Sequence, residues 1–308
     1  HIVDAAVTQH RRSIVRATAT TTESATATTT ATAAALARTF ACALALALGA
    51  LAFITLGFIY IPLIVVVINS FNASRTFSWP PTSFSLHWWQ QIGSSKGVVP
   101  AITASIKVGL AATVIALILG TCIAFAVSRY SFYGKNTLSL LVIFPIALPG
   151  VVTGIALNTT LHTFLDPFQK ELALWTIVVG HATFCIVVVY NNVLARLRRL
   201  GSSYEEASQD LGANVFQTFR FVTFPLIRSS LVAGGLLAFA LSFDEIVVTT
   251  FTAGPATQTL PLWIFNNLFR PNQAPIVNVV ATLLIVLFIF PVWLSQKLSQ
   301  DSAGGGRI

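Results

Sequence analysis

The stretch "LRRLGSSYEEASQDLGANVFQTFRFVTFPLIRSS", residues 197–230, interrupts a series of long apolar runs. Ser203 lies three residues before Glu206, which is the spacing of a helix-capping box, and helix-forming residues follow. Gly212 is typical of a helix C-terminus, because glycine adopts the left-handed conformation without strain. The stretch therefore predicts a helix, a glycine turn and a second short helix, "NVFQTFRFV", which ends before Pro225.

The composition around this stretch is that of an integral membrane protein. Of the 308 residues, 55% are hydrophobic and 9% are charged, whereas a soluble domain carries about 25% charged residues. The net charge of +8 is scattered between the apolar runs and forms no patch of its own, so we expect no nucleic-acid partner. The dispersed histidines and cysteines show no metal-ligand spacing, and no metal site is predicted.

Six apolar segments reach the length of about 20 residues that a helix needs to cross a bilayer. We therefore expect an all-α membrane protein, with a low-complexity polar tail at 1–35 and a six-helix domain at 36–308. The six transmembrane helices are predicted at about 40–68, 98–127, 138–157, 172–194, 230–252 and 276–294.

Two of these spans have special features. The first, at 40–68, is longer than the apolar core of a signal peptide, so it is expected to remain as an anchor. The third contains "FPIALPGVVTG". Its residues Pro145, Pro149 and Gly150 predict a kinked or broken helix, because proline removes a backbone donor and glycine weakens the helix.

The distribution of Lys and Arg predicts the orientation. If the N-terminus is cytoplasmic, thirteen of them fall in the tail, the inner loops and the C-terminal end, and four fall in the outer loops. The four outer ones are Arg75, Lys96, Lys170 and Arg270. Positive residues are enriched on the cytoplasmic side, so both termini and the loop at about 195–229 are expected in the cytoplasm, with the chain in contact with the lipid bilayer.

The cytoplasmic loop has two possible roles on the residues alone. An amphipathic helix pair offers an apolar edge that a partner protein can bind. The same pair can instead rest on the lipid head groups as an interfacial helix. The pattern does not decide between these two interpretations.

The segment "EEASQDLGANVFQTFRFVTFP", residues 205–225, resembles the EAA loop of binding-protein-dependent ABC importer permeases. The resemblance rests on an acidic residue with alanine, a Leu-Gly-Ala turn, an aromatic-rich helix and a proline, and Ser208 departs from the commoner second alanine. It implies a type I importer permease in which this loop couples to an ATPase. The residues implied in the coupling are Glu206, Ala207, Asp210, Leu211 and Gly212.

The resemblance also implies partners. They are a second permease subunit that completes the pore, a cytoplasmic ATPase dimer and an extracytoplasmic substrate-binding protein, all at a bacterial plasma membrane. The chain has no GxxxxGK[ST] phosphate loop, so ATP and Mg are expected on the partner ATPase. This chain is expected to bind no cofactor and to have no catalytic residues.

The segments 241–255, "LSFDEIVVTTFTAGP", and 258–282 are similar to the PotC/YdcV-like branch, the spermidine/putrescine permeases. This implies that the cargo is a polyamine. A polyamine carries several ammonium groups on an aliphatic chain, so its path needs carboxylates together with apolar or aromatic walls. The candidate pathway residues are Phe243, Asp244, Glu245 and Thr249.

Asp244 and Glu245 lie in the fifth predicted span, where each charge costs a few kcal/mol. In a continuous helix from 230 to 252, Glu245 would lie about 22 Å from the start, past the midplane. Its face also carries Ser242 and Thr249, so Glu245 is expected to face the pore. Asp244 has more apolar neighbours, and a structural ion pair with Lys107 is an alternative role for it.

Three other functions are compatible with part of the pattern. The first is an ABC importer permease for another substrate, because the EAA loop carries no information about cargo. The second is a self-contained cation/proton antiporter that uses the acid pair, but it leaves the long cytoplasmic loop unexplained and no inverted repeat is visible. The third, an intramembrane enzyme, lacks a paired nucleophile and base.

Overall fold

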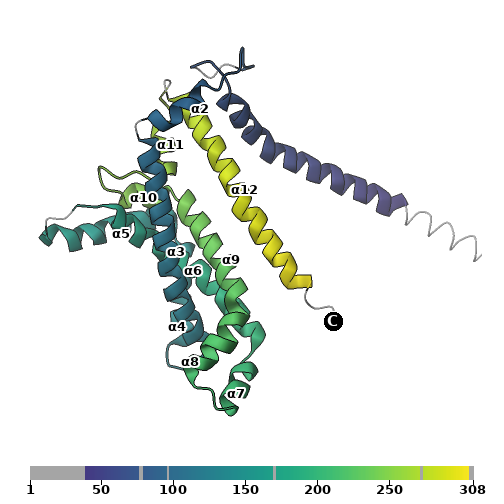
Figure 1. Cartoon of the computed structure of the whole chain (residues 1–308), viewed down its shortest axis with the longest axis vertical. Helices are drawn as coiled ribbons and strands as arrows, with labels where there is room; N and C mark the ends of the chain where they lie inside the picture. Colours follow the sequence, from purple (N-terminus) through teal and green to yellow (C-terminus); the bar gives the residue numbers. More distant parts are fainter. Residues whose placement is uncertain (1–38, 76–78, 96, 169–170, 271–272, 305–308) are drawn as a thin grey trace, which may run out of the picture. The chain divides into compact units, whose positions relative to one another are not determined.

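The computed structural model describes residues 39–75, 79–95, 97–168, 171–270 and 273–304, and the predicted tail at 1–35 lies outside them. The chain divides into two units, 1–65 and 66–308. In the described residues the regular structure is helical (Figure 1), apart from an isolated bridge between Asn72 and Phe84. The predicted all-α class is confirmed.

The described part of the first unit, residues 39–65, belongs to a helix that runs from Thr39 to Ser70. It has 32 residues, and none of its most apolar window is buried. Its large side chains, Phe40, Phe53 and Phe58 among them, are exposed. An apolar helix surface that is exposed in this way is suited to lipid, which agrees with the first predicted span.

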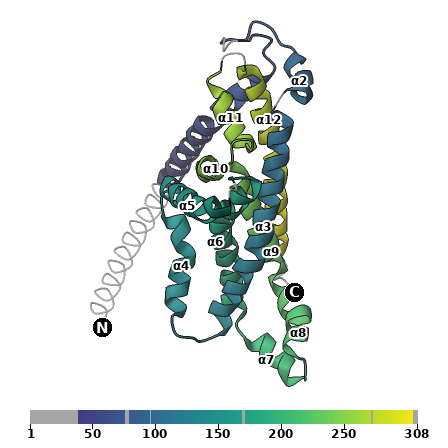
Figure 2. The ribbon, with the colours of Figure 1, turned by 90° about the vertical axis from the view of Figure 1, so that its left-hand side faces the viewer.

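Three long helices form the core of the second unit. They are α3 (Val98–Arg129), α6 (Leu174–Leu200) and α9 (Phe224–Asp244), which lie side by side in Figures 1 and 2. The face of α3 toward α6 carries small residues, and a Cβ at Gly120 would lie 2.9 Å from the Ile186 carbonyl oxygen. Small residues let helix backbones approach closely inside a membrane.

The third predicted span is broken, as its prolines and glycine indicate. Helix α4 (Lys135–Ala147) and helix α5 (Gly150–Leu165) are bent by 104° around Leu148 and Pro149. Both residues between them have extended ψ angles. Proline disfavours the helical conformation of the residue before it, which explains the break at this position. A short 3-10 helix, Asp166–Phe168, follows α5.

The fifth predicted span is wrong in two respects. The helix does not continue to residue 252, because α9 ends at Asp244 and a separate helix, α10, covers Val247–Thr252. The helix also begins earlier than predicted. α8 (Val215–Thr218), a π-helical segment (Phe219–Thr223) and α9 form one continuous helix. Pro225 lies inside this continuous helix, two residues after the π-helical segment, so it does not separate two helices as predicted.

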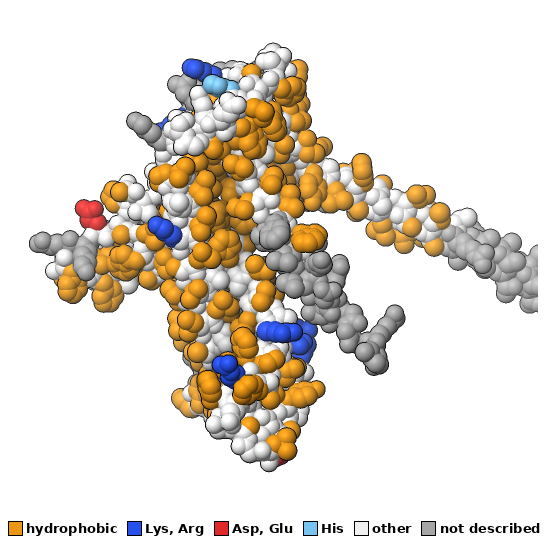
Figure 3. Space-filling view, viewed as in Figure 1, with side chains coloured by type: hydrophobic (Ala, Val, Ile, Leu, Met, Phe, Trp, Pro, Cys, Tyr) orange, Lys and Arg blue, Asp and Glu red, His pale blue; other side chains and the backbone are white. Residues whose placement is uncertain are grey.

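The remaining helices are α2 (His87–Gln91), a 3-10 helix (Ile92–Ser94), α7 (Ser203–Asp210), α11 (Leu260–Leu268) and α12 (Ala274–Gly304). Within the second unit, α2 and α11 lie at one end and α7 and α8 at the opposite end (Figure 2). Hydrophobic side chains cover much of the face shown in Figure 3, and charged ones are sparse on it.

Over the described residues, four helices are long and apolar enough to cross a membrane: Thr39–Ser70, Val98–Arg129, Leu174–Leu200 and Val215–Asp244. The bent pair α4–α5 adds a fifth candidate, and α12 contributes a shorter apolar part, Ala274–Ile289. The chain is therefore a multi-pass membrane protein. The count of six spans and the cytoplasmic position of both termini stay predictions.

Candidate functional site

Helices α7 and α8 meet at the predicted glycine turn. Gly212 has φ +88°, and its N–H donates to the Gln209 carbonyl at 2.8 Å. The Ala213 N–H donates to the Ser208 carbonyl at 3.1 Å, which completes the two hydrogen bonds of a Schellman motif. A Cβ at Gly212 would meet no atom within 4 Å, so the backbone angle is what requires glycine here.

The capping box lies at the second helix and not at the first. Asn214 Oδ1 accepts from the Gln217 N–H, and Gln217 Oε1 accepts from the Asn214 N–H, both at 2.9 Å. The predicted box of Ser203 and Glu206 is wrong, because Ser203 is already inside α7 and the N-cap is Ser202. Ser202 has ψ −11° and makes no side-chain cap bond. An N-cap residue normally needs an extended backbone to do so.

The predicted coupling residues form an exposed surface on the helix pair. Glu206, Ala207, Asp210, Leu211 and Gly212 are all exposed. The Leu211 side chain is 90% exposed, and the neighbouring apolar side chains Val215, Phe216 and Phe221 are exposed too. Exposed apolar and acidic side chains on one short helix pair, at the end of a membrane unit, suit a protein partner.

An ion pair attaches the helix pair to the long helices. Arg129, the last residue of α3, bonds Glu205 of α7 through Nε to Oε2 at 2.7 Å and through Nη2 to Oε1 at 3.1 Å. Arg129 also donates to the carbonyls of Gly201, at 2.6 Å, and Leu197, at 3.4 Å, near the end of α6. The Thr223 hydroxyl donates to Glu205 Oε1 at 3.2 Å.

This attachment was missed by the sequence reasoning, which singled out Glu206 of the two adjacent glutamates. Glu206 is exposed, whereas the side chains of Arg129 and Glu205 are 16% and 18% exposed. A bidentate pair of this kind is stronger and more directional than a single contact. The two glutamates therefore differ in place, with Glu205 turned inward and Glu206 outward.

The second candidate region is the break between α9 and α10. Glu245 is extended, with φ −73° and ψ 121°, and its Oε1 accepts from the Val248 N–H at 2.9 Å. Its carboxylate therefore satisfies one of the free N–H groups in the first turn of α10. The β-branched residues Ile246, Val247 and Val248, which follow the acid pair, also favour helix less than other residues do.

The four predicted pathway residues lie in different surroundings. Phe243 is buried and packs against Phe239 of α9 and Phe288 of α12, at ring-centre distances of 5.7 and 5.2 Å. Thr249 is fully buried, Glu245 is half-buried and Asp244 is exposed. The face argument that favoured Glu245 over Asp244 is wrong, because it assumed a continuous helix.

The alternative ion pair of Asp244 with Lys107 is absent. In the part of the chain that the structure describes, the ion pairs are Arg129–Glu205 and His162–Asp166. No described residue lies within ion-pair or hydrogen-bond distance of the Asp244 carboxylate. Asp244 is the more exposed of the two carboxylates.

A buried histidine lies beside the break. His181 of α6 is fully buried, with Nδ1 2.8 Å from Ser242 Oγ of α9 and Nε2 2.8 Å from Thr249 Oγ1 of α10. Thr249 Oγ1 donates in turn to the Glu245 carbonyl at 2.8 Å. The five histidines are dispersed along the sequence, and no local pattern marks His181.

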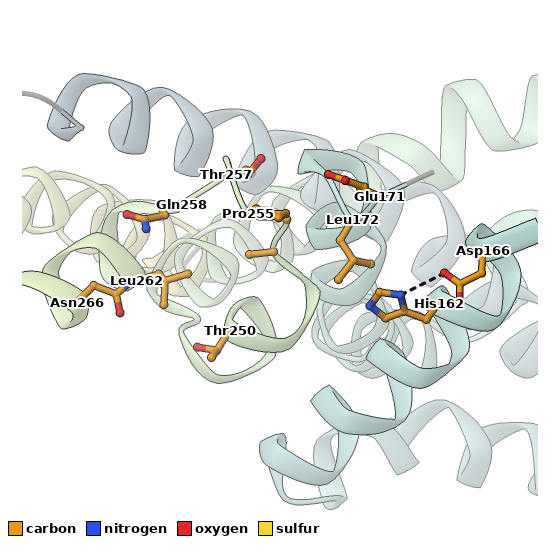
Figure 4. Close-up of a pocket in the computed structure, with 12 residues that line it drawn as sticks. His162, Asp166, Glu171, Leu172, Thr250, Pro255, Thr257, Gln258, Leu262 and Asn266 are labelled. Carbon is orange, nitrogen blue, oxygen red and sulfur yellow. Dashed lines mark hydrogen bonds and ion pairs between the residues drawn. The ribbon is translucent and has the colours of Figure 1, made fainter. Parts of the chain in front are cut away.

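A cavity of about 490 Å³ borders the second helix of the break (Figure 4). Thr250 of α10 lines it together with two acids, Asp166 and Glu171, and His162, whose Nδ1 lies 3.4 Å from Asp166 Oδ1. Helix α5 also packs closely on α10, where Asn158 Nδ2 donates to the Phe251 carbonyl at 2.6 Å. Polar groups of α5 and of the segment that follows it therefore lie beside α10.

Comparison with known proteins identifies relatives. The family model described as "Binding-protein-dependent transport system inner membrane component" matches residues 112–302. The spermidine/putrescine transport system permease protein PotC of Haemophilus influenzae is 33% identical over 254 residues, which cover 82% of this chain and 96% of that protein. The putrescine transport system permease protein PotI of Escherichia coli is 33% identical over 232 residues, 74% of this chain and 82% of that protein.

A solved structure has the same fold. It is the crystal structure of a bacterial ABC transporter involved in the import of the acidic polysaccharide alginate. One of its chains superposes with a TM-score of 0.61 and 18% identity, over 86% of this chain and 96% of that chain. At this identity the likeness shows the fold, and it carries no information on the cargo.

Proposed function

This chain belongs to the family of inner membrane components of binding-protein-dependent transport systems, and from this premise we propose that it is the permease subunit of an ABC importer for polyamines. The observation that supports the cargo is the similarity to relatives named as spermidine/putrescine and putrescine permeases. The family also favours an importer subunit over a self-contained antiporter or an intramembrane enzyme.

In this proposal the exposed helix pair couples the permease to the ATPase. Leu211, Val215 and Phe216 supply the apolar contact, while Glu206 and Asp210 supply charge at its edge. The ATPase dimer is cytoplasmic and binds ATP and Mg, and this chain binds neither. A second permease subunit supplies the other half of the pore, and a substrate-binding protein delivers the cargo from outside the bacterial plasma membrane.

The cargo passes the break between α9 and α10. An ammonium group that leaves water needs a carboxylate in place of its hydration shell. Asp244 is exposed and has no described partner, so it is the first candidate for this contact. Glu245 remains a second carboxylate, although its Oε1 is held by the Val248 N–H. Broken helices at substrate sites are a recurrent feature of transporters.

Uptake by the reconstituted complex tests both parts of this proposal. We expect ATP-dependent uptake of radiolabelled putrescine and spermidine when the substrate-binding protein is present, with competition by unlabelled polyamines and none by sugars or neutral amino acids. Asp244→Asn removes the charge and keeps the shape, so it should reduce polyamine uptake at least about tenfold. The matched control is Asp166→Asn, which removes an exposed carboxylate at the cavity.

Two results would contradict the proposal. ATP-dependent uptake of another cargo without competition by polyamines would overturn the cargo assignment and leave the permease role standing. Equal uptake by Asp244→Asn and wild type, at equal amounts of protein in the membrane, would remove Asp244 from the pathway.

A further inference from the structure

We infer that His181 is a positioning residue, which holds α9 and α10 in the arrangement that presents Asp244 and Glu245 to a cationic cargo. The inference rests on the proposed function for the identity of the cargo. It concerns a residue of α6, which lies outside the acid pair and makes no contact with either carboxylate in the described hydrogen bonds.

The geometry places His181 across the break. One ring nitrogen reaches Ser242, three residues before Glu245, and the other reaches Thr249, four residues after it, both at 2.8 Å. All three side chains are buried, with relative exposures of 0%, 2% and 0% for His181, Ser242 and Thr249. A single side chain thus joins the end of one helix to the body of the next.

The direction of each hydrogen bond follows from the protons available. The Thr249 hydroxyl has one proton, which it donates to the Glu245 carbonyl at 2.8 Å. Thr249 Oγ1 must therefore accept from His181, so the proton of the neutral ring is on Nε2. Nδ1 is then the acceptor, and the Ser242 hydroxyl donates to it. The result is a polarised chain from Ser242 through His181 and Thr249 to the backbone of Glu245.

This series of hydrogen bonds lies where the helix has lost its own backbone hydrogen bonds. The extended conformation of Glu245 interrupts the backbone pattern between α9 and α10. The Glu245 side chain restores one bond, to the Val248 N–H, and its carbonyl receives another, from Thr249. His181 connects these local bonds to α6. The position of Glu245 is therefore fixed relative to a long helix of the core.

The neighbouring residues of α6 bring α10 close enough for this contact. A Cβ at Gly180 would lie 3.1 Å from Val248 Cγ1 and 3.2 Å from Thr252 Cγ2, so the absence of a side chain permits the approach. One turn earlier, the Thr176 hydroxyl donates to the Thr252 carbonyl at 2.7 Å. α6 therefore holds α10 at two levels. Cys185 and Arg196 of α6 also donate to carbonyls of α9, and among the described hydrogen bonds His181 is the α6 side chain that joins α9 and α10 to each other.

The consequence is a specific effect on cargo binding. If His181 is removed, the two helices can still pack, but the carboxylates at the break lose their fixed spacing. A diammonium cargo depends on that spacing, so we expect a higher KM for putrescine. The exposed helix pair makes none of these contacts, so the basal ATPase rate of the assembled complex should stay near the wild-type rate.

The test uses the full reconstituted complex with three variants of this chain. His181→Phe keeps an aromatic ring and removes both hydrogen bonds, and His181→Gln can keep one of them. Thr183→Val is the matched control, because its hydroxyl bonds only the Gly180 carbonyl of its own helix, at 2.6 Å. We expect the KM for putrescine to rise about tenfold in His181→Phe and less in His181→Gln. The control should keep the wild-type KM.

A second readout is independent of the cargo. In a background with Cys42→Ala and Cys122→Ala, which removes the two exposed cysteines, Asp244→Cys is labelled with a charged methanethiosulfonate reagent in the assembled complex. The added His181→Phe change should alter the labelling rate at least about fivefold, because the break becomes mobile. Thr183→Val should leave the rate unchanged.

The outcomes separate this inference from the proposed function. A changed labelling rate together with absent putrescine uptake in the wild-type complex would support the positioning role and overturn the cargo. An unchanged labelling rate together with an unchanged KM in His181→Phe would overturn the positioning role. If His181→Phe does not assemble, the same two measurements on Ser242→Ala and Thr249→Val decide, since each removes one end of the bridge.

Discussion

The two candidate functional regions of this chain are held in place by different chemistry. At the exposed helix pair, a charged bidentate contact between Arg129 and Glu205 joins α3 to α7. At the break between α9 and α10, a neutral histidine bridges two hydroxyl groups. The first contact retains some solvent access, with side chains 16% and 18% exposed, whereas His181 has none.

The difference follows from the cost of burying charge. An ion pair at the edge of the protein keeps part of its hydration, and its attraction offsets what it loses. Inside a membrane-spanning bundle the free energy needed to remove a charge from water is higher. Hydrogen bonds between neutral groups therefore fix the geometry there with a smaller loss of stability. Asp244 is exposed and has no described partner at the end of an apolar helix, so we expect it to serve a ligand.

The largest effect is expected from Arg129→Ala. It leaves the half-buried Glu205 without its partner and removes the bonds to the Gly201 and Leu197 carbonyls. We expect a loss of about 3 kcal/mol, seen as a lower thermal midpoint of the purified complex and a loss of receptor-stimulated ATPase activity. Arg228→Ala, at an exposed position of α9, is the control. Full stimulation in Arg129→Ala would show that the ion pair does not hold the helix pair.

A smaller effect should separate the two adjacent glutamates. Glu205→Gln keeps the shape but weakens the contacts with Arg129 and Thr223, so we expect a loss of about 1–2 kcal/mol. Glu206→Gln should leave the thermal midpoint unchanged, because Glu206 is exposed. If Glu206 touches the ATPase, its variant should still lower the receptor-stimulated ATPase rate. Equal midpoints for the two variants would remove the distinction between an inward and an outward glutamate.

The smallest effect concerns salt. Raising the salt from about 0.1 M to about 1 M shortens the Debye length from roughly 10 Å to roughly 3 Å. The difference in thermal midpoint between wild type and Glu205→Gln should therefore shrink at high salt. The corresponding difference for Ser242→Ala, which affects only the neutral bridge, should stay constant. A salt-dependent effect of Ser242→Ala would contradict the assignment of neutral groups to the break.

Much of the fold was predictable because its signals are local. The apolar runs identify a multi-pass membrane protein, Pro149 and Gly150 predict the break between α4 and α5, and Gly212 predicts the turn between α7 and α8. Each signal lies within a few residues of the feature it produces. The family resemblance of residues 205–225 was also readable, since its motif is a contiguous stretch.

The parts that were predicted wrongly concern where a helix continues and where it stops. Pro225 was expected to end a short helix, but the helix continues through it, directly after a π-helical segment. The acid pair was placed on a continuous helix, and the exposure of Asp244 and the capping by Glu245 came only from the break. Residues before and after Glu245 do not share one helical periodicity, so their faces cannot be assigned from one continuous helix.

What the sequence alone determined is the class of this protein, the approximate positions of most of its helices and the family to which it belongs. Only the tertiary structure decided which glutamate faces inward, which of the two adjacent acids in 244–245 is exposed, and which histidine joins α9 to α10. Arg129 and Glu205 are 76 residues apart, and His181 lies 61 and 68 residues from Ser242 and Thr249. Such pairings depend on how helices pack, and a side-chain pattern along one segment contains no information about the segment that will lie beside it.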